Sequence, residues 1–175
     1  MPGVSEVVAM GSRYTRRLLE SAALGVASGV AGTLALHVTH EASYKYAPQT
    51  LPPMREEPGH YMVRRATGLL PQRAQEKVTD QDRDRAATML SFAYGAVWPA
   101  LYLGLRGRRA GVLLDGAALG IAVWGIGYLG WLPQLQLSPP VREQTATQVF
   151  NNVAQHALYG VLTVAAWRGM RSLFD

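Results

Sequence analysis

The sequence predicts an all-α, polytopic membrane protein with four transmembrane helices, and three observations support this fold class. Four stretches are almost free of charge, and each is long enough for a spanning helix, which needs about 20 mostly apolar residues. Only 17% of the 175 residues are charged, whereas 49% are hydrophobic. The charged residues are concentrated between the apolar stretches, which are 21–40, 86–105, 110–141 and 144–167.

These boundaries predict a single four-helix transmembrane domain that covers residues 1–175. A long extracytoplasmic connection with short helical segments is expected at 43–79. The spans are expected near residues 18–42, 80–106, 109–133 and 146–171.

The composition excludes several classes of site. The sequence has no cysteine, so disulfides, thiolate metal sites and cysteine nucleophiles are excluded. The formal net charge is +5, but the basic residues flank the apolar stretches. We interpret them as topology signals and expect no nucleic-acid partner.

The distribution of lysine and arginine in the short segments predicts the orientation. Basic residues precede the first span, follow the second and follow the fourth, whereas the segment after the third span has only Arg142. Positively charged short segments stay in the cytoplasm. We therefore expect both termini to be cytoplasmic. The residues that carry this argument are Arg13, Arg16, Arg17, Arg106, Arg108, Arg109, Arg168 and Arg171.

The first span is expected to be an uncleaved helix, because no small-x-small cleavage site follows its apolar run. Ser21, Gly25 and Gly29 repeat every four residues, and Gly32 lies beside them. Such a stripe of small residues allows the backbone of another helix to approach closely in lipid.

The connection after the first span contains a candidate interfacial helix at 58–70, which Pro71 is expected to end. Thr79 has the character of an N-cap, so the second helix is expected to begin near residue 80. Pro99 lies in the middle of this helix. It removes one backbone donor and pushes against the carbonyl of Gly95, which predicts a kink.

The third span repeats the small-residue pattern of the first, with Gly116 and Gly120. This predicts a second close helix contact. The set of residues expected to pack against neighbouring helices is Ser21, Gly25, Gly29, Gly32, Gly116 and Gly120.

Polar side chains at membrane depth are the first candidates for a functional site. At the outer end of the first span, spacings of three and four place His37 on the same side of the helix as His40 and Glu41. The candidate intramembrane polar network is His37, His40, Glu41, Asp115, Asn152 and His156.

Two interpretations of this network remain open. The favoured one is a set of hydrogen bonds that fixes helix register, in which His156 is neutral and bonded to Thr33, Thr39 or His40 of the first span. The alternative is a metal or haem held by His156 together with an outer histidine. Depth opposes it, because His156 lies about 14 Å along its helix and the outer histidines within about 5 Å of the surface.

No set of residues points to catalysis. Ser91 has no histidine or carboxylate at hydrogen-bonding spacing, so a serine nucleophile has no support. Asp115 is expected to reach the interface or pair with an arginine, with a proton relay as the alternative. We expect no catalytic, cofactor-binding or metal-binding residues, and a protein that is not an enzyme.

Several short motifs follow one another in a characteristic order. They are Glu41, Pro52-Pro53-Met54-Arg55, Phe92-Ala93-Tyr94-Gly95, Gly116-x-x-x-Gly120-x-x-x-Trp124 and His156-Ala157-Leu158-Tyr159-Gly160. This order resembles the YagU-like family of small bacterial inner-membrane proteins of unknown function, and the resemblance covers about residues 22–167. Members often have a histidine where this chain has Ser91. The resemblance implies a bacterial inner membrane and a link to envelope or acid-stress physiology, but no reaction.

The leading functional interpretation is a non-enzymatic accessory or scaffold subunit of a membrane complex, or a bundle that associates with itself. Its expected partners are the lipid bilayer and other membrane subunits or a second copy. A small transporter or proton-conducting protein that uses Asp115 and His156 is the first alternative. A haem- or quinone-binding electron-transfer subunit is the second.

Overall fold

The structure is a computed structural model that describes the backbone of residues 4–173 and the side chains of 15–107 and 109–173. The described chain is helical and contains no strand, which confirms the all-α class. Short 3₁₀ turns lie at Pro48–Thr50, Gly107–Arg109 and Val141–Glu143. The remaining elements are α1 (Val4–Tyr46), α2 (Pro58–Thr67), α3 (Gln72–Gln75), α4 (Asp80–Arg106), α5 (Val112–Trp124), a π-helical segment (Gly125–Trp131), α6 (Leu132–Gln134) and α7 (Ala146–Ser172).

Three helical stretches are long and apolar enough to cross a membrane, namely Thr15–Tyr46, Asp80–Arg106 and Val112–Gln134. The fourth long helix, α7, has 27 residues. It is not among the three, because several polar residues lie in its first half. They include Asn151, Asn152, Gln155 and His156.

The helix ends follow local backbone chemistry. α1 continues to Tyr46, beyond the expected end at 42, and stops where Pro48 disfavours a helical conformation at Ala47. The third long helix begins at Val112 and not at 109, because Gly107 has a positive φ of 54° and starts a short 3₁₀ turn. The helix expected at 58–70 ends at Thr67, before Gly68 and well before Pro71.

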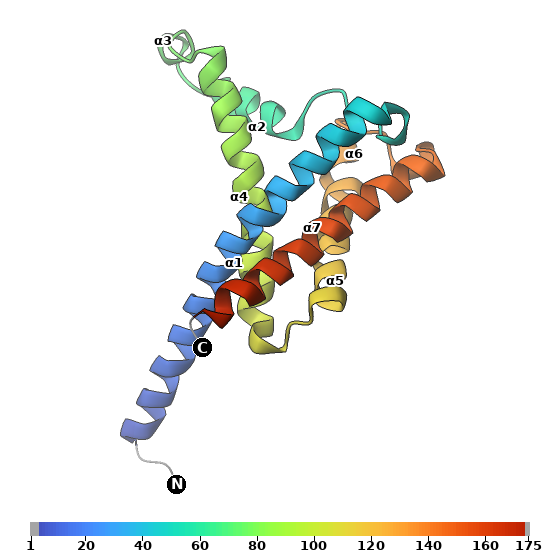
Figure 1. Ribbon diagram of the computed structural model, residues 1–175. Helices are drawn as coiled ribbons and strands as arrows, with labels where there is room; N and C mark the ends of the chain where they lie inside the picture. Colours follow the sequence, from blue (N-terminus) through green and yellow to red (C-terminus); the bar gives the residue numbers. More distant parts are fainter. Residues whose placement is uncertain (1–3, 174–175) are drawn as a thin grey trace.

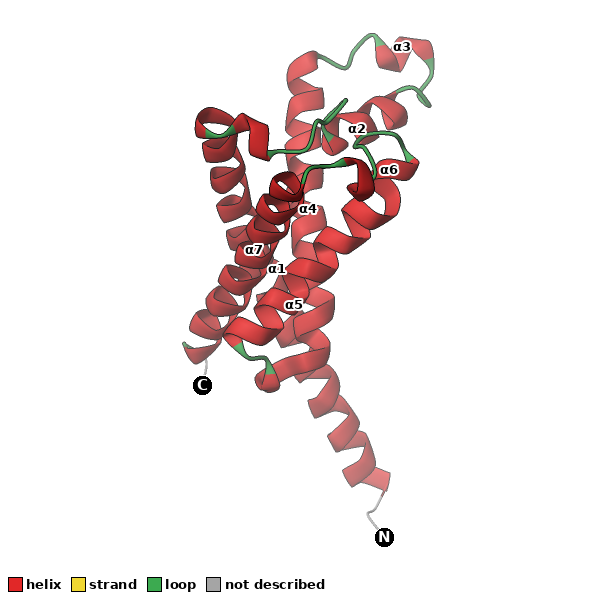
Figure 2. Ribbon diagram, turned by 90° about the vertical axis from the view of Figure 1, so that its right-hand side faces the viewer, coloured by secondary structure: helices red, strands yellow, loops and turns green. Residues whose placement is uncertain are grey.

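The four long helices cross near the middle of the molecule (Figure 1). α1 packs against α4 and α7, and α5 packs against α7. The start of α1, the end of α7 and the turn between α4 and α5 lie toward one end, whereas α2, α3 and α6 lie at the other, as a second view confirms (Figure 2).

Residues without bulky side chains form the contact between α1 and α4. A Cβ atom added to Gly29 would lie 2.6 Å from the Cα atom of Ala96, and one added to Gly25 would lie 2.7 Å from the Cα atom of Ala100. In the opposite direction, Gly95 of α4 receives the side chain of Thr33. A larger residue at Gly25 or Gly29 would force the two backbones apart, and one at Gly95 would displace the Thr33 side chain.

The same device joins α7 to its neighbours. A Cβ atom on Gly116 would lie 2.5 Å from the Cα atom of Val161, and one on Gly120 would overlap the carbonyl of His156. Gly32 of α1 faces Thr163. At the end near the termini, the carbonyl and hydroxyl oxygens of Ser21 accept hydrogen bonds from Trp167 Nε1 and Arg171 Nη1, both at 3.2 Å.

Pro99 leaves one carbonyl of α4 without its helical donor, and α7 supplies a replacement. Pro99 has no N–H, so the carbonyl of Gly95, four residues earlier, loses its usual partner. The hydroxyl of Tyr159 donates to this oxygen at 2.6 Å. Tyr159 is only 1% exposed, so this bond holds α7 against α4 near Pro99.

We predict that Tyr159→Phe lowers the free energy of unfolding by about 0.6 kcal/mol and at most about 2, as for other interhelical bonds in lipid. The loss should shrink when Pro99→Ala is also present, because this substitution restores a backbone N–H that can donate to the Gly95 carbonyl. Unfolding of the four proteins of this double-mutant cycle in detergent, followed by circular dichroism, measures both effects. An equal loss in the two backgrounds would contradict the proposed role of the bond.

Candidate functional site

A cavity of about 900 Å³ lies between α1, α4, the π segment and α7. The loop before α2 and the first turns of α2 cover it. Its floor is the helix crossing, since Thr33, Gly95 and Tyr159 line it. Three histidines and five other aromatic residues also line it, namely His37, His40, His156, Tyr44, Tyr94, Tyr128, Trp131 and Tyr159.

The π segment forms one wall of the cavity. π-helical turns are rare and often occur at functional sites. Here Gly127, Tyr128 and Trp131 of the segment line the cavity. The sequence predicts a continuous helix in this region, so the π segment was not expected. The available signal was the spacing of Gly125, Gly127 and Gly130, the last of which has φ −101° and ψ −109°.

The cavity brings together His40 and His156, which were expected to lie at different depths. His40 Nδ1 lies 3.4 Å from Oε1 of Gln155, the residue before His156. The expected difference in level is therefore wrong. The expectation fails because α1 is longer than expected. The helix continues to Tyr46, which places His40 more than one turn inside the helix end.

His156 bonds within its own helix. Its Nδ1–H donates to the backbone carbonyl of Asn152 at 2.9 Å, so the expected bond to the first span is wrong. Two of the expected partners, Thr33 and Thr39, bond within α1 instead. Their hydroxyls donate to backbone carbonyls of α1 at 2.8 and 2.9 Å. The His156 ring meets the Tyr128 ring edge-on, with centroids 5.8 Å apart.

A chain of polar side chains connects α1 and α7 beside the cavity. The amide nitrogen of Gln155 donates to the hydroxyl of Ser43 at 2.8 Å, while its oxygen faces His40. One turn toward the helix start, Asn151 donates to the hydroxyl of Thr50 at 3.0 Å. These bonds give the polar first half of α7 partners within the protein.

Of the six residues expected to form a polar network, four line the cavity, namely His37, His40, Glu41 and His156. Asn152 lies next to it, with a side chain that is 4% exposed. The sixth, Asp115, belongs to a separate cluster at the end near the termini. Its carboxylate accepts hydrogen bonds from Tyr102 Oη at 2.6 Å, Arg106 Nε at 2.7 Å and Gly111 N at 2.5 Å.

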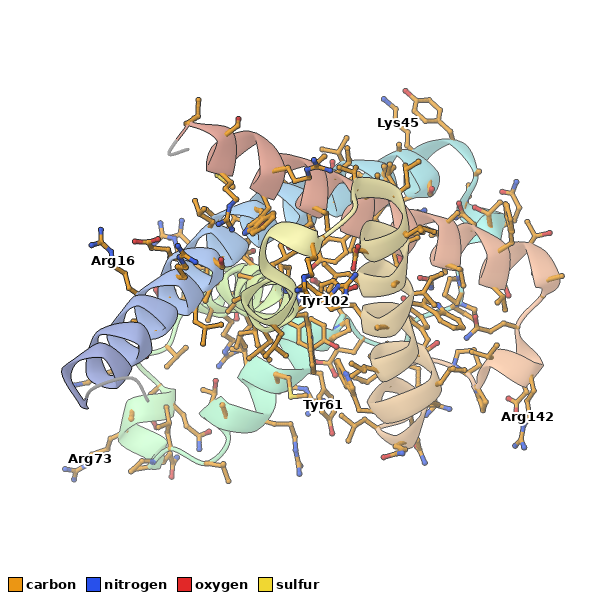
Figure 3. The ribbon with its side chains drawn as sticks, turned by 90° about the horizontal axis from the view of Figure 1, so that it is seen from below. Arg16, Lys45, Tyr61, Arg73, Tyr102 and Arg142 are labelled. Atoms are coloured by element: carbon orange, nitrogen blue, oxygen red, sulfur yellow. The ribbon has the colours of Figure 1, made fainter. Side chains whose placement is uncertain are left out.

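The Asp115 cluster closes the turn between α4 and α5. Tyr102 lies among the helices, whereas Arg16, Arg73 and Arg142 point away from the molecule (Figure 3). Three hydrogen-bond donors surround the Asp115 carboxylate, so its charge is paired within the fold. This arrangement agrees with the expected arginine pairing.

The side chain of His60 joins α2 to α4 beside the cavity. His60 Nδ1 lies 2.7 Å from Glu57 and its Nε2 lies 3.0 Å from Asp84 of α4. Next to this bridge, Arg64 makes two bonds to Glu56, at 3.0 and 2.7 Å. The hydrogen bonds to Asp84 and Glu57 raise the pKa of His60 above its ordinary value.

The histidines of the cavity are the residues that could hold a ligand. A ring whose Nδ1–H donates to a protein oxygen presents Nε2 as an acceptor or metal ligand. Among the residues that the structure describes, no three histidine or carboxylate side chains group as a metal site. No family model matches the sequence, and no curated protein or solved structure matches it either.

We predict that acidic pH strengthens the attachment of α2. Because the pKa of His60 is raised in the folded protein, its contribution is complete below the ordinary value of about 6.5 and disappears as pH rises through the raised value. Hydrogen-exchange protection of residues 58–67 should therefore be higher at pH 6 than at pH 9. His60→Gln should remove this difference, whereas Arg73→Gln in α3 should keep it. A pH dependence that survives His60→Gln would contradict the prediction.

Proposed function

We propose that the chain is a multi-pass protein of a bacterial inner membrane in which α7 is a fourth span, with both termini cytoplasmic. The three apolar helices support a membrane location. The start of α1 and the end of α7 lie at the same end of the molecule (Figure 1), as four spans require. The bacterial inner membrane is what the motif resemblance implies.

The polar residues of α7 are compatible with a span because they face protein. Asn151 and Gln155 bond to the outer end of α1 and the turn that follows it, and His156 bonds to its own helix. The residues that α7 exposes include large apolar ones, with Phe150 74% exposed and Leu158 41% exposed. In a bilayer, Asn151, Gln155 and His156 thus have hydrogen-bond partners inside the bundle, as membrane helices require, whereas the buried amide nitrogen of Asn152 has none in the described chain.

The topology predicts a distinct labelling pattern. Since the sequence has no cysteine, a single introduced cysteine is the only thiol. Arg142→Cys should react with a membrane-impermeant maleimide on intact cells, and Arg109→Cys only after the cells are permeabilised. Labelling of residue 109 on intact cells would contradict the orientation.

Within this topology, we propose that the protein is a non-enzymatic accessory subunit that binds a small amphipathic molecule in the cavity. The observation that carries this proposal is the cavity, whose volume of about 900 Å³ lies within the range of ligand sites, about 300–1,000 Å³. At the α2 end of the cavity lie the exposed charged residues Arg55 and Glu57, whereas apolar and aromatic residues, including Leu36, Val123 and Tyr159, line its interior.

The transport alternative has less support. A proton path through Asp115 requires a carboxylate that releases and takes up protons, and Arg106 and Tyr102 hold this one as an ion pair. Asp115 also does not line the cavity that contains the histidines. An additional partner subunit, or a second copy, remains part of the proposal for the exposed apolar faces.

We predict that gentle extraction retains a bound small molecule and that filling the cavity removes it. Ser91 lines the cavity from α4, so Ser91→Trp should occupy the space. Native mass spectrometry should show an added mass on the wild type and none on this variant. Val97→Trp is the matched control, because Val97 lies on the same helix and is 50% exposed. Equal masses for all three proteins, once corrected for the substitutions, would contradict a ligand in this cavity.

A further inference from the structure

We infer that the cavity binds the reduced, hydroquinone ring of a membrane quinol, whose hydroxyl groups donate to Nε2 of His40 and His156. This inference rests on the proposed ligand-binding function and specifies the class of ligand. It concerns binding only, and no bond is formed or broken.

The hydrogen bonds of the two histidines determine which ring nitrogen carries the proton. The carbonyl oxygen of Asn152 can only accept, so the Nδ1 atom of His156, at 2.9 Å, is the donor. The amide of Gln155 donates its N–H to Ser43 at 2.8 Å and turns its oxygen toward His40 Nδ1. His40 Nδ1 therefore also carries the proton. In both neutral rings, Nε2 is an acceptor.

These acceptors are available to a ligand. Both histidines line the cavity. Neither Nε2 atom makes a hydrogen bond within the part of the chain that the structure describes. A ligand that meets both rings must therefore bring hydroxyl or amine donors. A hydroquinone has two hydroxyl donors on opposite sides of its ring, whereas the oxidised quinone has only carbonyl acceptors.

The walls of the cavity suit a flat aromatic ring. Each histidine has an aromatic neighbour in edge-on contact, Tyr44 at 5.1 Å from His40 and Tyr128 at 5.8 Å from His156. Tyr94 also lines the cavity, and its buried hydroxyl has no partner in the described chain. Aromatic rings at these spacings stabilise an inserted ring by offset or edge contacts.

The rim of the cavity provides a place for an apolar tail. Met62 of α2 and Leu90 of α4 line the cavity and are 40% and 44% exposed. Because α4 is one of the apolar candidate spans, a tail that leaves beside Leu90 enters lipid. A quinol carries such a tail, whereas a water-soluble phenol does not.

The test uses the full chain in detergent, with a decyl-tailed benzoquinol and the matching benzoquinone as probes. Binding is followed by quenching of tryptophan fluorescence, since Trp131 lines the cavity. The quinol should bind at least about tenfold more tightly than the quinone, because the quinone leaves both imidazole acceptors unpaired. This comparison uses the unmodified protein and so does not depend on the folding of a variant.

Variants then locate the acceptors. His40→Phe and His156→Phe should each weaken quinol binding about tenfold and leave quinone binding nearly unchanged. Val97→Phe is the control, because Val97 of α4 does not line the cavity and is 50% exposed, and it should bind the quinol as the wild type does. Equal affinities for quinol and quinone, or His40 and His156 variants that bind quinol like the wild type, would overturn the inference.

Two further outcomes separate the inference from the proposed function. If native mass spectrometry shows a ligand that Ser91→Trp removes, but the quinol does not bind, the cavity is a site for another molecule and only the inference fails. A visible absorption band that disappears in His156→Phe would identify a haem and would likewise overturn it. If neither a native ligand nor the quinol binds, the proposed function fails as well.

Discussion

The close approach of α1, α4 and α7 at residues without bulky side chains is the constraint on which the rest of the structure depends. Gly25, Gly29 and Gly95 bring α1 and α4 into backbone contact, and Gly32 does the same for α1 and α7. Such contacts replace the hydrophobic effect, which cannot drive helices together in lipid. Helices that touch at one level must separate beyond it, so the cavity begins directly above the crossing, where Gly95 lines its floor.

Two irregular backbone features border this cavity. Pro99 deprives the Gly95 carbonyl of its donor, and Tyr159 restores the bond from another helix. The π segment Gly125–Trp131 forms another wall. Irregular backbone at membrane depth is tolerated where protein or a cavity surrounds it. Both features therefore lie where the bundle opens into the cavity.

The polar residues divide between two ends with different roles. Near the termini, Asp115 is enclosed by Arg106, Tyr102 and Gly111 and fixes the turn between α4 and α5. At the other end, His40 and His156 use Nδ1 for contacts within the fold, and their Nε2 atoms have no hydrogen-bond partner in the described chain. The two groups differ in how many of their hydrogen-bonding atoms have partners. A carboxylate with three donors is structural, whereas a neutral imidazole with an unpaired acceptor nitrogen has remaining binding capacity.

The sequence by itself determined the all-α class, three of the apolar spans and the helix starting at Asp80. These properties depend on local patterns of charge, proline and capping residues. Only the tertiary structure decided that His40 and His156 share one cavity, that Tyr159 donates to Gly95 and that a π turn lines the wall. Spacing fixes which residues share one helix face, but the level at which two helices meet depends on where each begins and how they cross. That information resides in the contacts between distant residues.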